Sequence, residues 1–172
     1  NPIFAIGFKE KSEGDAVKLQ ATYNCLLEYI FGKSSAFYNR LYDSGDIFDL
    51  SPSFNISKQC AFVEIAGEAE NPKKVYEEVK KEIQRVKKCG FDEEEVTVIK
   101  NALYGKFLRK LNDVESIASD FAGNAFLGGE FLKYGEYLLE LDGKKLADTL
   151  NEGFCESTLS QVLPMETAGG EK

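Results

Sequence analysis

Two groups of residues in this 172-residue chain could do chemistry, and the first lies between Gly32 and Gly45. Gly32-Lys33-Ser34 matches the end of a phosphate-binding loop, but the full pattern needs a glycine five positions before Gly32, where the chain has Leu27. Such a loop also follows a strand, whereas apolar residues at helical spacing lead into Gly32. We therefore reject nucleotide binding at this segment.

Hydroxyl and aromatic side chains of the same region are the remaining candidates there: Ser35, Tyr38, Tyr42 and Phe48 could face a cleft or an interface. Tyr38 and Tyr42 are spaced i and i+4, so they share one helix face, where packing is the ordinary role and a substrate-facing hydroxyl is the alternative. The second group is the paired carboxylates, such as Glu93 to Glu95, which lie at helix starts or in loops. The helix dipole already accounts for acidic residues in those places, so they are weak general acids or bases.

The absence of histidine narrows the chemistry further. It excludes a Ser-His or Cys-His catalytic pair and a histidine-ligated zinc site within this chain. The four cysteines, Cys25, Cys60, Cys89 and Cys155, lack metal-ligand spacing. We interpret them as reduced thiols of a cytoplasmic protein, with Cys25 and Cys60 buried because both lie in apolar runs. We expect no catalytic, cofactor-binding or metal-binding residue here.

The formal net charge of −8 argues against nucleic acid and against an anionic membrane surface as partners. Lysines gather between Lys73 and Lys88, but glutamates alternate with them, which is typical of a solvated helix face rather than a basic binding patch. No long apolar span is present, so we expect no membrane segment.

The elements that must position these residues follow from periodicity. Alternation predicts strands at residues 2–9, 47–57 (interrupted by Pro52), 59–66 and 157–163. Helical spacing predicts helices at residues 15–31, 35–43, 72–89, 92–111, 112–127, 134–139 and 144–152. The order indicates an α+β fold, in which helices pack on one face of an antiparallel sheet. A single domain over residues 1–165 and a frayed tail over 166–172 are expected.

Capping signals set several helix starts. Asn71-Pro72 is an N-cap followed by proline at the first helical position. Asp92 with Glu95, and Asn112 with Glu115, have the spacing of capping boxes. The helix that follows Asp92 has an expected inner face, which consists of Val96, Ile99, Leu103 and Leu108. Strands 2–9 and 59–66 should be central, because both of their faces are apolar.

Taken in order, these pieces resemble the second domain of the insulinase/pitrilysin (inverzincin) zinc metallopeptidases, and most closely the bacterial processing-peptidase-like members. The segments that carry the resemblance span nearly the whole chain and are residues 6–9, 26–45, 65–72, 102–105 and 111–118.

The resemblance implies a division of labour. In that family the zinc motif His-x-x-Glu-His lies in the preceding domain, and two half-shells enclose a substrate chamber. Second domains of active members carry an Arg and a Tyr that hold the substrate. Here Tyr42 falls where the Arg would be, and Phe48 where the Tyr would be. Tyr42 cannot supply the cationic fork of the Arg, and Phe48 lacks the phenol hydroxyl of the Tyr, so neither position can act on a scissile carbonyl as the family's residue does.

The implied function is a non-catalytic C-terminal domain that forms part of a chamber wall and a domain interface. The implied partners are the preceding N-terminal domain of the same polypeptide, a paired homologous subunit, and peptide substrate through the parent protein, which would also hold the zinc. The alternative is an inactive scaffold or protein-assembly module with the same fold.

Overall fold

The protein is described by a computed structural model that covers residues 1–163. The tail predicted at residues 166–172 lies outside the described residues, as do the last two residues of the predicted domain. The strands are β1 (Ile3–Glu10), β2 (Asp49–Ile56), β3 (Ala61–Glu68) and β4 (Ser157–Val162). The helices are α1 (Ala16–Phe31), α2 (Ala36–Asp43), α3 (Pro72–Cys89), α4 (Glu93–Lys110), α5 (Val114–Phe126), the short 3₁₀ helix η1 (Phe131–Lys133), α6 (Tyr134–Leu139) and α7 (Gly143–Glu152).

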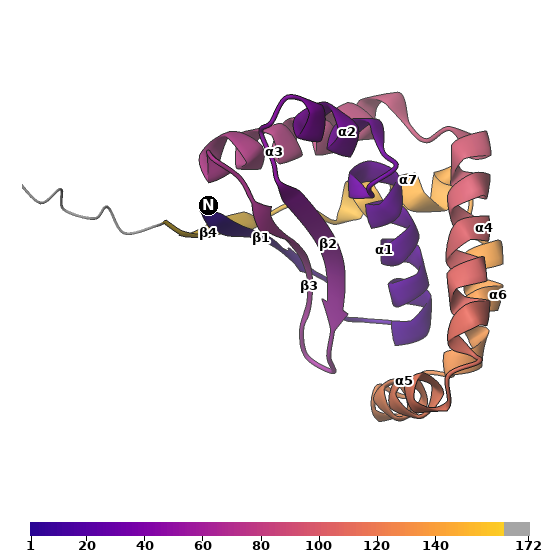
Figure 1. The fold of residues 1–172 in the computed structure, drawn as a ribbon. Coiled ribbons are helices and arrows are strands. Elements are labelled where there is room, and N and C mark those ends of the chain that lie inside the picture. Colours follow the sequence, from indigo (N-terminus) through magenta and orange to yellow (C-terminus); the bar gives the residue numbers. More distant parts are fainter. Residues whose placement is uncertain (164–172) are drawn as a thin grey trace, which may run out of the picture.

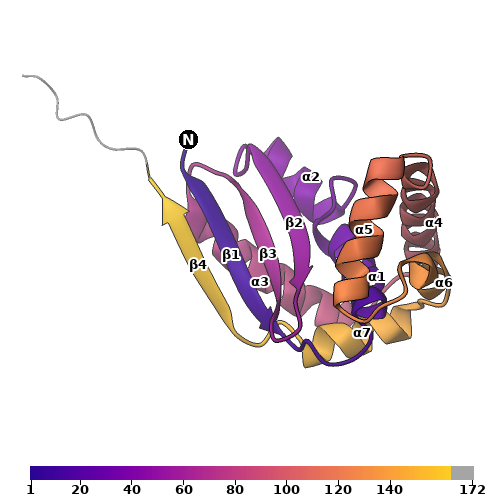
Figure 2. The same cartoon turned by 90° about the horizontal axis from the view of Figure 1, so that it is seen from below.

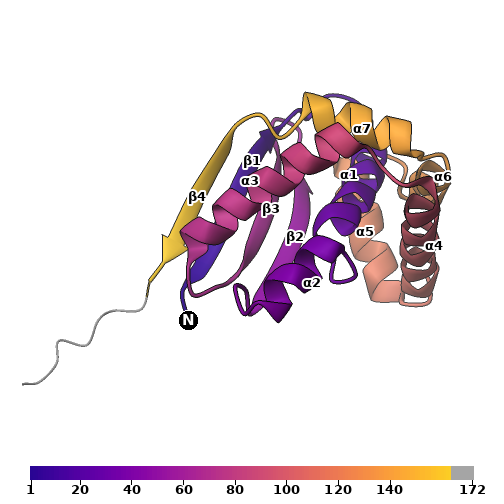
Figure 3. The same ribbon diagram turned by 90° about the horizontal axis from the view of Figure 1, so that it is seen from above.

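The four strands form one antiparallel sheet in the order β2-β3-β1-β4. Helices α1 and α3 cover one face of this sheet, and α4 and α6 pack on the side of α1 that faces away from it (Figures 1 and 3). The opposite face, seen in Figure 2, is not covered by a helix of residues 1–163. The predicted α+β class, with helices on one face of an antiparallel sheet, is confirmed.

Alternation along the two central strands builds the core. Phe4, Ile6 and Phe8 of β1 and the inward residues of β3 are almost fully buried against α1 and α3. The central position of both strands was predicted correctly, but for a wrong reason. The other face of the sheet leaves Ile3 and Phe62 exposed, so it is an open surface rather than a second core.

Pro52 does not break the second strand. Strand β2 runs without interruption through it, and Pro52 pairs with Ile65 of β3. Because β2 is an edge strand of the sheet, a missing backbone N–H at this position can be tolerated.

Local capping explains most helix starts. The side chains of Asp15, Ser35, Asn71 and Asp92 each accept a backbone N–H in the first turn of α1, α2, α3 and α4 respectively. The capping box predicted for Asn112 and Glu115 is wrong. Helix α5 starts after Asp113, because the N–H groups of Asn112 and Asp113 bond back to the last carbonyls of α4 and form a turn.

Two burial predictions are also wrong. Leu108 is exposed and its neighbour Phe107 is buried instead, because Phe107 continues the helical spacing of Val96, Ile99 and Leu103 and its ring packs against η1 and α6. Cys60 is exposed in the turn between β2 and β3, whereas Cys25 is buried as predicted; all four cysteines are free thiols.

Candidate functional site

The segment from Gly32 to Phe48 is a structural connection built around α2. The Ser35 hydroxyl accepts the N–H of Tyr38 at 3.1 Å and so caps the helix. Ser35 and Tyr38 are buried, and the ring of Tyr38 supports that of Tyr42, with centroids 5.9 Å apart and planes 14° apart. Tyr42 remains 54% exposed. The structure therefore places Ser35 and Tyr38 beneath the surface and Tyr42 upon it.

Phe48 lies on the other side of a tight turn. Gly45 adopts φ +74°, which favours glycine, and the chain then enters the sheet when the N–H of Phe48 donates to the carbonyl of Glu68 at 2.8 Å. The Phe48 side chain is 43% exposed. Of the four predicted residues, only Tyr42 and Phe48 thus present substantial surface outside the core.

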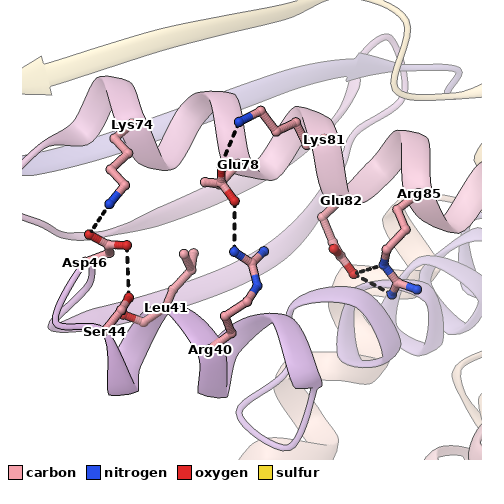
Figure 4. Close-up of polar contacts among 9 residues, drawn as sticks. All are labelled: Arg40, Leu41, Ser44, Asp46, Lys74, Glu78, Lys81, Glu82 and Arg85. Atoms are coloured by element: carbon pink, nitrogen blue, oxygen red, sulfur yellow. Dashed lines mark hydrogen bonds and ion pairs between the residues drawn. The ribbon is translucent and has the colours of Figure 1, made fainter.

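Ion pairs hold α2 and the turn after it against α3 (Figure 4). Arg40 meets Glu78 at 2.9 Å, and Lys81 shares the same carboxylate at 2.8 Å. Lys74 reaches Asp46 at 2.7 Å, where the Ser44 hydroxyl also donates at 2.9 Å. Figure 4 shows these side chains directed at one another across the space between the two helices.

These contacts keep the carboxylates ionised. The ammonium of Lys74 and the hydroxyl of Ser44 hold the pKa of Asp46 below its usual range. Lys81 and Arg40 do the same for the pKa of Glu78. A carboxylate with a lowered pKa that is already paired with cations is a poor proton donor or acceptor near neutral pH. The segment is therefore suited to holding two helices together rather than to acid–base chemistry.

A buried carboxylate that the sequence analysis missed lies at the end of β1. Glu10 accepts the hydroxyl of Tyr23 at 2.7 Å and the backbone N–H of Phe154 at 2.9 Å. Burial raises the pKa of Glu10 above its usual range, against the opposing effect of these two donors. The alternation Phe4, Ile6, Phe8 continues inward to Glu10 and could have indicated its burial, but not its partner 144 positions away.

The ring of Tyr23 stacks on that of Phe54, with centroids 4.1 Å apart. The cluster therefore joins β1, α1, β2 and the segment that leads into β4. Its hydrogen bonds are satisfied internally, so it fixes the position of β4 rather than offering a group to a ligand.

The residues do not fit a zinc site. The chain has no histidine, and no three cysteine, aspartate or glutamate side chains within residues 1–163 come together in a metal-binding group. In the same part of the chain, no helix is long and apolar enough to cross a membrane.

Helix α5 has its apolar side turned outward. Val114, 79% exposed, and Phe121, 61% exposed, belong to a stripe at helical spacing whose members are all exposed, namely Val114, Ala118, Phe121, Ala122 and Ala125. The side that faces the body is partly polar, since Asp120 pairs with Lys110 at 2.5 Å. An amphipathic helix ordinarily buries its apolar side, so this stripe has no partner within the described residues.

Helix α5 and the open face of the sheet lie on the same side of the molecule, as Figure 2 shows. A cleft of about 480 Å³ separates the end of β2 from α5. The open face carries small or apolar residues along β1, such as Ala5 and Gly7, and polar residues along β2, such as Ser51 and Ser53. Helix α5 and the open face thus lie next to each other on one side of the molecule.

The comparison with known families decides what this architecture is. Residues 1–103 match the family described as the peptidase M16 inactive domain. This chain is a peptidase M16 inactive domain. The zinc-metallopeptidase resemblance inferred from the sequence is thereby confirmed.

Individual relatives agree with this assignment. A zinc protease of Bacillus subtilis named YmfH, itself uncharacterized, is 32% identical over 132 residues, which make up 73% of this chain and 30% of that protein. An M16-like peptidase from Alicyclobacillus acidocaldarius has the same fold, with a TM-score of 0.88 and 21% identity over 95% of this chain and 41% of that one. The inactive peptidase domain of a zinc protease from Bordetella parapertussis superposes with a TM-score of 0.79 and 12% identity, over 98% of this chain and 94% of that one.

The M16 inactive domain thus spans less than a third of the curated relative it matches and about two fifths of the Alicyclobacillus chain. The matched family region ends within α4. The outward-facing α5 follows it, and structural comparison extends the likeness over nearly the whole chain.

Proposed function

We propose that this M16 inactive domain is the non-catalytic C-terminal domain of a zinc-peptidase-like polypeptide. Its open sheet face forms part of the substrate chamber wall, and α5 forms the interface with the preceding, zinc-bearing domain. Tyr42 and Phe48 occupy the substrate-gripping positions without the cation and the phenol, so the domain contributes surface rather than chemistry. Ser35 and Tyr38 support Tyr42 from within. Its free thiols are compatible with the cytoplasm.

The outward stripe of α5 carries this proposal. Exposed leucines or valines are ordinary when scattered, but a stripe of five apolar residues along one helix face is not. Its position beside the open face and the 480 Å³ cleft would let one partner cover both. The lengths of two relatives support a neighbouring domain as the partner, since the matched part makes up 30% of the Bacillus subtilis protein and 41% of the Alicyclobacillus chain.

The test is association in trans between this chain and the polypeptide encoded immediately before Asn1. Phe121→Glu should weaken binding at least about tenfold by calorimetry, because it places a charge in the centre of an apolar interface. Val98→Glu is the matched control: Val98 is 66% exposed but lies on α4, and binding should change less than about twofold. Equal binding by the native chain, Phe121→Glu and Val98→Glu would contradict an interface at α5.

The chain alone should neither retain stoichiometric zinc after dialysis nor cleave peptides. Proteolysis by the purified chain that a chelator abolishes would refute the non-catalytic assignment. The alternative, an inactive scaffold or assembly module with the same fold, would be favoured if the upstream sequence lacks a His-x-x-Glu-His motif. A paired homologous subunit would then be the expected partner.

A further inference from the structure

A groove of about 640 Å³ lies on the helical side of the sheet, between α3 and the segment that leads into β4. Its floor is apolar and includes Phe8, Ile83 and Phe154. One wall consists of polar side chains that share a single face of α3, namely Glu77, Lys80, Lys81, Gln84, Arg85 and Lys88. Figure 3 shows α3 running beside β1 and β4, and Ser157, the first residue of β4, is among the residues that line the groove.

The groove is cationic in an acidic protein. Four lysine or arginine side chains and one glutamate line it, while the whole chain has a formal net charge of −8. Lys80, Lys81 and Arg85 pair with Glu77, Glu78 and Glu82 of the same helix at 2.8, 2.8 and 2.6 Å respectively. The pair of Lys80 with Glu77 has the most exposed carboxylate of the three, and such exposed pairs are weak and leave the cation able to meet a second carboxylate. Lys88 has no ion-pair partner within residues 1–163. From the alternating lysines and glutamates of α3, the sequence predicted only a solvated helix face. The fold adds the edge of the sheet beside that face.

Strand β4 is that edge. It pairs with β1 on one side, and within the described sheet no strand pairs with its other side. Its position relative to α3 is fixed, because the hydroxyl groups of Tyr76 and Ser157 are 2.8 Å apart. An exposed strand edge offers unpaired N–H and C=O groups to an extended chain, and every second side chain of an added strand would point toward α3.

We propose that β4 and this groove bind an extended acidic peptide segment. The segment adds to the sheet through backbone hydrogen bonds with β4, and the carboxylates on its inner side pair with Lys80 and Lys88. Charge complementarity selects this occupant, because a basic segment would be repelled by the same lysines. The site lies on the helical side of the sheet, away from the open face and from α5, and does not depend on the function proposed for them.

Fluorescence anisotropy with a labelled probe tests the charge requirement. The probe is a peptide of alternating glutamate and threonine, about ten residues long, so that all its carboxylates share one side of a strand. Replacing every glutamate by glutamine should weaken binding at least about tenfold, and raising the salt from about 50 to 300 mM should weaken it several-fold. Equal binding of the glutamine and glutamate peptides would overturn the proposal.

Variants locate the site. Lys80→Glu with Lys88→Glu should weaken binding at least about tenfold, whereas Lys58→Glu with Lys144→Glu, which makes the same change of net charge at exposed positions outside the groove, should weaken it less than about threefold. Lys88→Gln is a milder second variant, in case the double reversal lowers the melting temperature. The same loss in both double variants would show a general charge effect and refute the groove.

Backbone methylation tests strand addition. Two versions of the probe carry N-methyl groups at every second residue, one in each of the two registers. Strand addition predicts that one version loses binding while the other retains it, since only alternate N–H groups face β4. Equal binding of both versions would refute strand addition. Phe121→Glu should bind the probe normally, which separates this site from the interface proposed at α5.

Discussion

Removing the carboxylate of Glu10 should destabilise the chain far more than neutralising it. In Glu10→Ala, the hydroxyl of Tyr23 and the N–H of Phe154 lose an acceptor at 2.7 and 2.9 Å and remain buried. Each unsatisfied buried donor costs about 1–3 kcal/mol, which gives a range of about 2–6 kcal/mol for two. The variant also no longer buries a carboxylate, so we expect the lower part of that range, about 2–3 kcal/mol.

Glu10→Gln separates hydrogen bonding from charge. Its carbonyl oxygen can still accept from Phe154, and its amide can donate to the hydroxyl oxygen of Tyr23. The Tyr23 proton loses its acceptor, but the variant no longer buries a charge, so the two effects offset and the free energy of unfolding should change by no more than about 1 kcal/mol at neutral pH.

The pH dependence has a definite sign. Burial raises the pKa of Glu10 above 4.5, so the folded protein binds this proton more readily than the unfolded chain. The resulting stabilisation is present below pH 4.5 and is lost as the pH rises through the raised pKa. Glu10→Gln should therefore gain stability relative to the native protein as the pH increases toward neutral.

Urea unfolding followed by circular dichroism, at several values between about pH 4.5 and 7.5, measures both effects. Glu13→Ala is the control, because Glu13 is an exposed carboxylate close to Glu10 in the chain, and it should change stability by less than about 0.5 kcal/mol. The reasoning is refuted if Glu10→Ala behaves like this control, or if Glu10→Gln is as destabilised as Glu10→Ala.

Two further predictions follow from local packing. Gly105 lies within α4 with open space where a Cβ would be, so Gly105→Ala should raise the free energy of unfolding by about 0.5–1 kcal/mol in urea. Gly135→Ala would bring a Cβ to 2.8 Å from the ring of Tyr104 and should lower the free energy of unfolding. A change of the same sign in both variants would contradict the packing described for these two glycines. Burial raises the pKa of Cys25 to about 11, so an aromatic disulfide reagent should modify the other three, exposed thiols in the native protein and Cys25 only after unfolding. Four rapidly reacting thiols would count against the burial of Cys25.

Predictions from the sequence succeeded where the signal was local. Asn71-Pro72 starts α3 as expected, because the Asn71 side chain accepts the N–H of Lys74 at 3.1 Å. Of the capping box predicted at Asp92 and Glu95, only one of the two hydrogen bonds forms. Asp92 accepts the N–H of Glu95 at 2.9 Å, but its own N–H donates to the hydroxyl of Tyr29 in α1. A tertiary contact replaced the local one.

Predictions failed where the outcome depended on which element packs on which face. Leu108 was expected on the inner face of α4, but Phe107 has the better helical spacing from Leu103, and α6 and η1 cover Phe107. Likewise, an apolar run around Cys60 suggested burial, but the turn between β2 and β3 lies at the surface. Such outcomes are set by residues far away in the chain.

The sequence by itself determined the α+β class, the absence of histidine chemistry and the kinship with zinc metallopeptidases. These depend on composition, on periodicity and on the order of short motifs. Only the tertiary structure decided that Glu10 meets Phe154, that the apolar side of α5 faces outward, and that lysines of α3 line a groove beside β4. Each of these results is a distance or an orientation between elements far apart in the chain, and periodicity gives the face of an element but not its neighbour.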